Sequence, residues 1–202
     1  MPALPLRPAT PADLPLLPGL QLAAGAAFRA IGMPEIADHP PPSAADFAPH
    51  QQLGHLWVGA DPADRPQGFL LARPLDGCAH IEQVSVHPSA AGRGLGRELI
   101  DHVEGWAAGR GLAALTLSTF RSVPWNAPYY RRLGFRELAD DRLTAALRQV
   151  LAEEAAFGLD LADRVCMRRP VTLPRPSAAA SRSPGRATAR PATGPTAARP
   201  RA

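Results

Sequence analysis

The feature that most constrains this chain is a strand-like run that ends in a glycine-rich turn and continues as an amphipathic helix. The run ends at Val86-His87-Pro88, the turn is Gly92-Arg93-Gly94-Leu95-Gly96, and apolar residues then recur at helical spacing. Glycine lets the backbone turn sharply and approach a ligand closely. The first turn of a helix presents unpaired N–H groups at the positive end of the helix dipole. The segment therefore predicts an anion site flanked by Arg93 and Arg97, suited to a phosphate or diphosphate.

Two better-known phosphate loops do not fit this segment. The Rossmann fingerprint requires GxGxxG and an acidic residue about 20 positions further on. Here the glycines form GxGxG, and no strand ending in Asp or Glu follows at that place. The P-loop requires a lysine, and the chain contains none, because all 22 of its basic side chains are arginines.

The positive net charge of +4 belongs to one end of the chain. Residues 170–202 contain six arginines, seven prolines and no acidic residue, whereas residues 1–169 hold 16 arginines against all 18 acidic residues. The composition of 170–202 predicts a disordered, solvated tail without a partner, and the alternative is weak electrostatic contact of its arginines with nucleic acid or acidic lipid. The body 1–169 is predicted to fold as one domain with no nucleic-acid or membrane partner.

Several other classes of protein are excluded on composition. No run of 18 uninterrupted apolar residues is present, so no membrane span is expected, and the first ten residues lack a basic-then-apolar leader. The two cysteines, Cys78 and Cys166, are far apart and show no CxxC spacing, so neither a disulfide scaffold nor a metal site is expected. These features favour a cytoplasmic protein without a metal.

The body alternates strand-like and helix-like segments. Thr10-Pro11-Ala12-Asp13 and Ser43-Ala44-Ala45-Asp46 carry helix-start signals, and the proline-rich segment 34–42 between the two helices reads as a loop. Strands are expected at 4–8, 56–60, 68–72, 80–86, 112–117, 135–138 and 165–168, and helices over 10–31, after 43, over 95–109, from 126 to 134 and over 143–157. This order predicts an α/β chain (α+β, with a mixed sheet) whose sheet is flanked by helices.

Two motifs in this order resemble the GCN5-related N-acetyltransferase (GNAT) superfamily over residues 4–169. The first is the strand end with its glycine turn, and the second is Asn126 followed by Tyr130-Arg131-Arg132-Leu133-Gly134-Phe135. The resemblance implies a βααβββαβαβ core whose central strands splay apart to admit acyl-CoA. It departs from the family at Ala91, where Gln or Arg usually begins the loop.

The resemblance implies acetyl-CoA as co-substrate and a set of residues that bind it. The backbone amides of the glycine turn would hold the diphosphate, and the strand before the turn would pair with the pantetheine arm as an added strand does. Asn126 would cap its helix and reach the same arm. The implied cofactor-binding residues are Val84, Ser85, Val86, Gly92, Arg93, Gly94, Leu95, Gly96, Arg97 and Asn126.

Acetyl transfer to an amine requires a base, an oxyanion donor and an acid for the leaving thiolate. Glu82 is the favoured base and His80 the second candidate, and regular strand alternation places both on one face with Val84 and Val86. The resemblance places Tyr130 at the thioester sulfur as the acid. Two alternatives stay open: Glu82 is a solvent-facing strand residue without a catalytic role, and Tyr130 packs its short helix against the sheet.

The acceptor is expected against segments 28–42 and 119–125, where Glu35, Phe120 and Trp125 are candidate contacts, although a solvated loop explains these residues equally well. The function predicted is N-acetyl transfer from acetyl-CoA to a primary amine of a small molecule, amino acid or peptide. The alternative is a non-catalytic acyl-CoA-binding regulatory module. The sequence leaves the oligomeric state open, a homodimer included.

Overall fold

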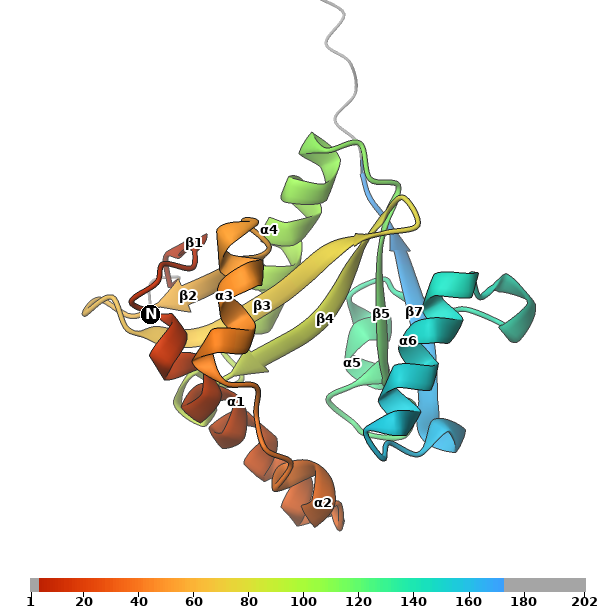
Figure 1. Ribbon diagram of the computed structural model, residues 1–202, viewed down its shortest axis with the longest axis horizontal. Helices are drawn as coiled ribbons and strands as arrows, with labels where there is room; N and C mark the ends of the chain where they lie inside the picture. Colours follow the sequence, from red (N-terminus) through yellow and green to blue (C-terminus); the bar gives the residue numbers. More distant parts are fainter. Residues whose placement is uncertain (1–3, 173–202) are drawn as a thin grey trace, which may run out of the picture.

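The strands described by the computed structural model, which covers residues 4–172, form one seven-stranded mixed sheet (Figure 1). The strand order is β1-β2-β3-β4-β5-β7-β6, and only the neighbours β4 and β5 run parallel. The strands are β1 (Leu6–Pro8), β2 (Leu56–Ala60), β3 (Pro66–Leu75), β4 (Cys78–Val86), β5 (Ala114–Phe120), β6 (Arg136–Glu137) and β7 (Arg164–Pro170). The predicted mixed sheet with flanking helices is confirmed.

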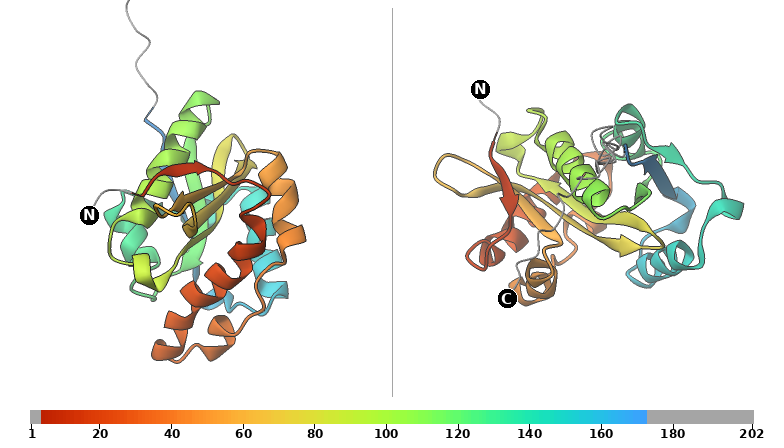
Figure 2. Two further views of the ribbon diagram at one scale, coloured as in Figure 1. Left: turned by 90° about the vertical axis from the view of Figure 1, so that its left-hand side faces the viewer. Right: turned by 90° about the horizontal axis from the view of Figure 1, so that it is seen from above.

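Helices cover both faces of this sheet (Figure 2). The α-helices are α1 (Leu17–Gly25), α2 (Pro34–Ala37), α3 (Ala44–Gln52), α4 (Leu95–Gly109), α5 (Ala127–Arg132) and α6 (Ala145–Ala156). The helices α4 and α5 lie on one face, and α1, α3 and α6 lie on the other. We call these the α4 face and the α6 face of the sheet.

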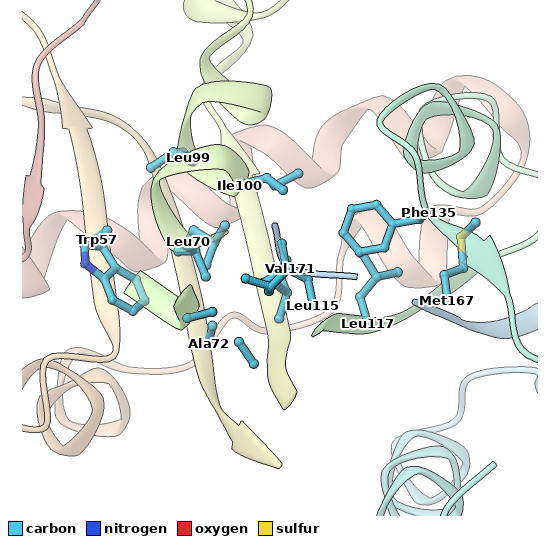
Figure 3. Packing of buried hydrophobic residues seen from close by; sticks show 14 of the residues in the cluster. Trp57, Leu70, Ala72, Leu99, Ile100, Leu115, Leu117, Phe135, Met167 and Val171 are labelled. Carbon is cyan, nitrogen blue, oxygen red and sulfur yellow. The ribbon is translucent and has the colours of Figure 1, made fainter. Parts of the chain in front are cut away.

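Each face has its own apolar core. On the α4 face, side chains of α4 pack against the central strands and against Phe135, as Figure 3 shows for Leu99, Ile100, Leu115 and Leu117. On the α6 face, Phe47 of α3 and Leu17 of α1 bury Phe69 of β3. The two cores fix the sheet between helical layers.

The strands β4 and β5 pair over three residues only and then separate. The pairs are Ala79↔Leu115, His80↔Thr116 and Ile81↔Leu117, although both strands continue beyond them. A β-bulge in β4 occurs at the same point. Ala72 of β3 pairs with Ile81, whereas the preceding Leu71 pairs with Gln83. Glu82 is therefore the extra residue of the bulge. A bulge bends its strand and increases the local twist. The result is a wedge, open toward the carboxyl ends of both strands (Figure 1).

The N-terminal helical region differs from its prediction. One helix was expected from Thr10 to Ile31, but the chain forms a 3₁₀ turn at Leu14–Leu16, then α1, then a second 3₁₀ segment at Ala26–Ile31. Thr10 does not cap a helix, since its N–H and hydroxyl both donate to Asp13 Oδ2 at 2.7 and 2.8 Å. Pro15 and Pro18 lack the N–H groups that a continuous helical ladder requires.

Two other boundaries shift for similar local reasons. The expected loop 34–42 contains α2, which begins at a proline in the first helical position, where its fixed φ is favourable. Ser43 forms the predicted cap, because its hydroxyl accepts from Asp46 N while Asp46 Oδ2 accepts from Ser43 N. The fold also passes the predicted domain end at 169, because Pro170 ends β7 and Val171 is buried and donates to Ala113 O. The remainder of the predicted tail, 173–202, lies outside the described residues.

One helical stretch among the described residues, Leu14–Ile31, is long and apolar enough to cross a membrane by length and composition, with a mean hydropathy of 1.3. This stretch is not an uninterrupted apolar run, because it contains Gln21 and Arg29. Core helices of soluble proteins and signal sequences near an N-terminus pass the same test, and 17% of this stretch is buried. In this fold Leu17 and Leu20 of the stretch are buried beneath the sheet.

The start of α4 is held against the sheet by Leu95, whose side chain lies over glycine backbone. A Cβ at Gly68 would lie 2.9 Å from Leu95 Cδ2 and 3.0 Å from Ser85 O. We therefore expect Gly68→Ala to lower the free energy of unfolding by about 1–3 kcal/mol through overpacking. Gly105→Ala is the matched control, because nothing lies within 4 Å of a Cβ there and alanine favours the helix by about 0.5–1 kcal/mol. Equal stability of the two variants in urea unfolding would contradict this packing.

Candidate active site

The glycine turn before α4 has the backbone that the sequence predicts. Gly92 and Gly94 adopt positive φ values of 72° and 89°, a region that side chains rarely enter, and Gly94 is the N-cap of α4. The helix then begins at Leu95, so its free N–H groups face the end of the sheet where β4 stops. Arg93 has no carboxylate partner within residues 4–172, while Arg97 Nε lies 3.4 Å from Asp101 Oδ2. The turn is suited to an oxyanion.

Beyond Ile81, the edge of β4 that faces β5 has no strand partner. Val84 and Val86 pack on the α4-face core, and Ser85 is buried on the other side, where its hydroxyl accepts from Gln83 Nε2 at 2.9 Å. An extended ligand chain in the wedge would therefore meet free backbone groups, as an added strand does.

The predicted alternation along β4 is wrong at one point. His80 and Glu82 were expected to share a face with Val84 and Val86. The bulge at Glu82 inserts one residue, so the two valines lie on the α4 face while His80 and Glu82 lie on the α6 face. The bulge thus separates the candidate bases from the strand segment predicted to bind the cofactor.

Glu82 lies in a cluster of charged groups on the α6 face. Arg73 Nε of β3 donates to Glu82 Oε1, and His50 Nδ1 of α3 lies 4.0 Å from Glu82 Oε2. The Glu82 side chain is 26% exposed, so solvent reaches its carboxylate. Sequence reasoning missed Arg73 and His50, because both contacts depend on the strand register and the docking of α3.

His80 is set apart from Glu82 by its burial. The ring is 2% exposed, and its Nδ1 lies in hydrogen-bonding distance, 3.0 Å, of Thr116 Oγ1 on β5. Burial lowers the pKa of His80 to about 4, because the charged imidazolium loses its hydration. The ring is therefore neutral at pH 7. It links β4 to β5 at the second of their three residue pairs.

Tyr130 lies in α5, where its ring packs edge-on against Tyr129 and Phe135 with centroid separations of 5.6 Å. Burial raises the pKa of the Tyr130 phenol above its ordinary value. The phenol thus stays protonated at neutral pH and can act as a proton donor. Tyr129 has a different neighbour: its hydroxyl lies 3.3 Å from the position of a Cβ on Gly96, in the first turn of α4.

Asn126 stands at the N-cap position of α5, but its side chain makes no capping hydrogen bond. The expectation that this side chain caps the helix is therefore wrong. Its backbone N–H instead donates to Val123 O at 2.9 Å, which closes the turn before the helix. The amide group is left available for another partner.

The predicted acceptor residues are only partly brought together. Phe120, at the end of β5, and Trp125 both contact Phe28, with ring centroids 5.8 and 5.5 Å apart. Trp125 is 38% exposed, so this aromatic cluster of Phe28, Phe120 and Trp125 reaches solvent. Glu35 is an exposed residue of α2, and within residues 4–172 no hydrogen bond or ion pair joins its side chain to the cluster.

A partly buried ion pair borders the same region and was missed by the sequence analysis. Arg164 Nε of β7 donates to Glu154 Oε2 of α6 at 3.0 Å, and the Ser118 hydroxyl donates to the same oxygen at 2.8 Å. The Arg164 guanidinium also lies 4.7 Å from the centre of the Phe120 ring. Ser118 is the first β5 residue after the last β4 pair, so this network lies at the vertex of the wedge. Ser118 is 36 residues from Glu154 and 46 residues from Arg164 in the sequence, so no local pattern predicts these contacts.

Within the part of the chain that the structure describes, no group of three or more His, Cys, Asp or Glu side chains could hold a metal ion.

A mixed sheet whose parallel strands β4 and β5 separate beside a glycine turn is the arrangement expected for the GNAT fold. The Acetyltransferase (GNAT) family matches residues 26–135, more than half of the chain, and the chain belongs to this family. The predicted superfamily and its fold are thereby confirmed.

Solved structures support the same fold at low sequence identity. The ribosomal-protein-S18-alanine N-acetyltransferase of Escherichia coli is 20% identical, with a TM-score of 0.56 over 84% of this chain and 95% of that chain. The PaiA N-acetyltransferase of Thermoplasma acidophilum, in complex with coenzyme A, is 13% identical, with a TM-score of 0.62 over 84% and 99%. A phosphinothricin acetyltransferase of Sinorhizobium meliloti, in complex with acetyl-CoA, is 20% identical, with a TM-score of 0.59 over 84% and 89%.

Proposed function

We propose that the chain transfers an acetyl group from acetyl-CoA to a primary amine of a small molecule, amino acid or peptide by direct attack. The observation that carries this proposal is the open wedge between β4 and β5 beside the glycine turn of α4. Two of the similar structures are complexes with coenzyme A and with acetyl-CoA, which supports the choice of co-substrate.

The residues of the wedge fit the two ends of acetyl-CoA. Its diphosphate suits the free N–H groups that follow Gly94, with Arg93 as the nearest unpaired cation. Because Ala91 supplies no polar side chain, this binding depends on backbone groups and arginine. The amide-rich pantetheine arm suits the unpaired edge of β4 from Glu82 to Val86.

Glu82 takes the proton from the attacking amine, directly or through one water molecule. Its side chain is partly exposed on the α6 face and lies at the bulge where the strands separate. Arg73 and His50 hold its position. His80 is the weaker candidate, because a neutral ring with a pKa of about 4 binds a proton poorly at neutral pH.

Backbone N–H groups on the free edge of β4 stabilise the oxyanion that forms when the amine attacks the thioester. The carbon–sulfur bond then breaks, and Tyr130 donates its phenolic proton to the departing thiolate. The phenol is protonated at neutral pH, and burial, which raises its pKa, holds the proton until a charged acceptor forms beside it. Alignment of amine and thioester in the wedge supplies much of the remaining acceleration.

The acceptor enters from the α6 face, past the aromatic cluster of Phe28, Phe120 and Trp125. Aromatic faces bind both apolar groups and the cationic form of an amine. A panel of primary amines assayed for free thiol release from acetyl-CoA tests the function directly. Release that depends on an amine supports the transferase, and saturable acetyl-CoA binding without such release supports the regulatory module. The pairing of Glu82 with Arg73 is the observation that favours the module.

Acetyl-CoA is expected to raise the melting temperature of the chain, because a ligand that binds only the native state stabilises it. At about 100 times Kd the gain is about 2.7 kcal/mol, which corresponds to roughly 5–10 °C for a domain of this size. S-acetylpantetheine is the control: it keeps the thioester and the arm but lacks the diphosphate, so it should shift the transition much less at the same concentration. Equal shifts of the melting temperature for both compounds would show that the glycine turn does not bind the diphosphate.

A further inference from the structure

A separate cavity of about 350 Å³ opens on the α6 face, at the end of the sheet away from the mouth of the wedge. Asp76 in the β3–β4 turn, Thr116 of β5 and Leu147 of α6 lie on three of its sides. It is distinct from the glycine turn, because α4 covers the opposite face of the sheet (Figure 2). None of the roles proposed above uses this cavity.

Two arginines with no acidic partner line the cavity. Arg142 and Arg168 have no carboxylate oxygen within 4.0 Å among residues 4–172, and the rest of the sequence contains no Asp or Glu. The neighbouring Arg169 shows the contrast, since its guanidinium pairs with Asp101 and Glu104. Asp76 is the acidic residue in the lining, so the lining carries a net charge of +1. This charge favours an anionic guest.

The position of Arg168 is fixed by the sheet. Thr116 of β5 stands opposite Arg168 of β7 on one side and opposite His80 of β4 on the other. Thr116 is 4% exposed, and its hydroxyl lies in hydrogen-bonding distance of His80. The residues between Arg168 and the wedge are therefore polar and held in place. Arg168 is half-buried, and partial burial strengthens its attraction for an anion.

Apolar side chains also line the cavity. Leu75, Leu138 and Leu147 belong to its lining, and α6 begins beside them with Thr144 as its N-cap. The positive end of this 12-residue helix adds to the field of the two arginines. A guest that matches this lining carries both an oxyanion and an apolar body.

We propose that this cavity binds a small organic carboxylate, with its carboxylate on Arg168 and Arg142 and its apolar body against the three leucines. A planar carboxylate matches the guanidinium fork through paired N–H···O bonds. An inorganic phosphate satisfies the arginines alone and leaves the leucines without a partner. The proposal does not depend on acetyl transfer, because no residue of the wedge takes part.

Cys78 reports on this cavity, because it lines the cavity and is half-buried, while Cys166 is buried and serves as the internal reference. The rate of Cys78 alkylation by neutral iodoacetamide is measured by peptide mass spectrometry on the full chain, without acetyl-CoA. Benzoate is expected to slow the reaction about tenfold at ten times its Kd, since only the free cavity reacts. Benzamide, with the same shape and no charge, and inorganic phosphate should each protect much less.

Two variants decide whether the arginines hold the anion. Arg168→Gln and, separately, the exposed Arg142→Gln are expected to raise the benzoate concentration needed for protection by about tenfold, the usual effect of one charge-assisted hydrogen bond. Arg65→Gln, an exposed change of equal charge in the β2–β3 turn, should leave it unchanged. Unaltered protection in both cavity variants, equal protection by benzamide, or protection by phosphate alone would each overturn the proposal.

Discussion

Tyr130→Phe is expected to lower the turnover of acetyl-CoA with the best primary amine by about 10²- to 10³-fold, while the affinity for acetyl-CoA stays within about threefold. The change removes one hydroxyl and keeps the ring, so the packing against Tyr129 and Phe135 is preserved. Without the phenolic proton, the thiolate must leave with its full negative charge. The loss therefore falls on the chemical step, and single-turnover measurements should show it at saturating acetyl-CoA.

Tyr129→Phe is the matched control, because it removes the same group from the adjacent position. The Tyr129 hydroxyl lies over Gly96 at the start of α4, so its loss should change acetyl-CoA affinity more than turnover. A structural role for Tyr130 alone would give a variant with lowered stability and nearly normal turnover. That pattern in thermal melts and kinetics would assign the tyrosine to packing.

Much of the fold could be predicted from local sequence because its signals are local. The Ser43–Asp46 capping box, the helical spacing that begins at Leu95, and the positive φ of Gly94 each depend on a few neighbouring residues. The N-terminal helix was overextended, because the prolines that divide it act through hydrogen bonds rather than through the apolar pattern. Val171 was assigned to the tail because composition does not show that one residue of a polar segment reaches the core.

The candidate site could be predicted only in part, because several of its relations are set by tertiary structure. The bulge at Glu82 breaks the strand period of two and moves Val84 and Val86 to the opposite face, and no residue type at that position requires it. The network of Ser118, Glu154 and Arg164 joins three elements distant in the chain. Motifs thus locate the cofactor turn, while strand register and helix docking arrange the groups around the reacting atoms.

Glu82→Gln is expected to lower kcat/KM for the amine by about 10²-fold at neutral pH and to remove the low-pH limb of its pH profile. Glutamine keeps the size of the side chain and can still accept a hydrogen bond from Arg73, but it cannot take a proton. The defect should shrink for acceptor amines whose own pKa lies below the assay pH, because such amines are already neutral and need no base. This dependence on amine basicity separates proton removal from substrate positioning.

The control for this change is Glu153→Gln, which removes the same charge at an exposed residue of α6 whose side chain accepts a hydrogen bond from Gln149. It should leave both the rate and the pH profile unaltered. His80→Asn addresses the competing base: it keeps a polar partner for Thr116, so a normal low-pH limb in this variant supports Glu82. If instead Glu82→Gln retains the limb and His80→Asn loses it, the buried imidazole takes the proton, and the bulge serves only to position Glu82 beside Arg73.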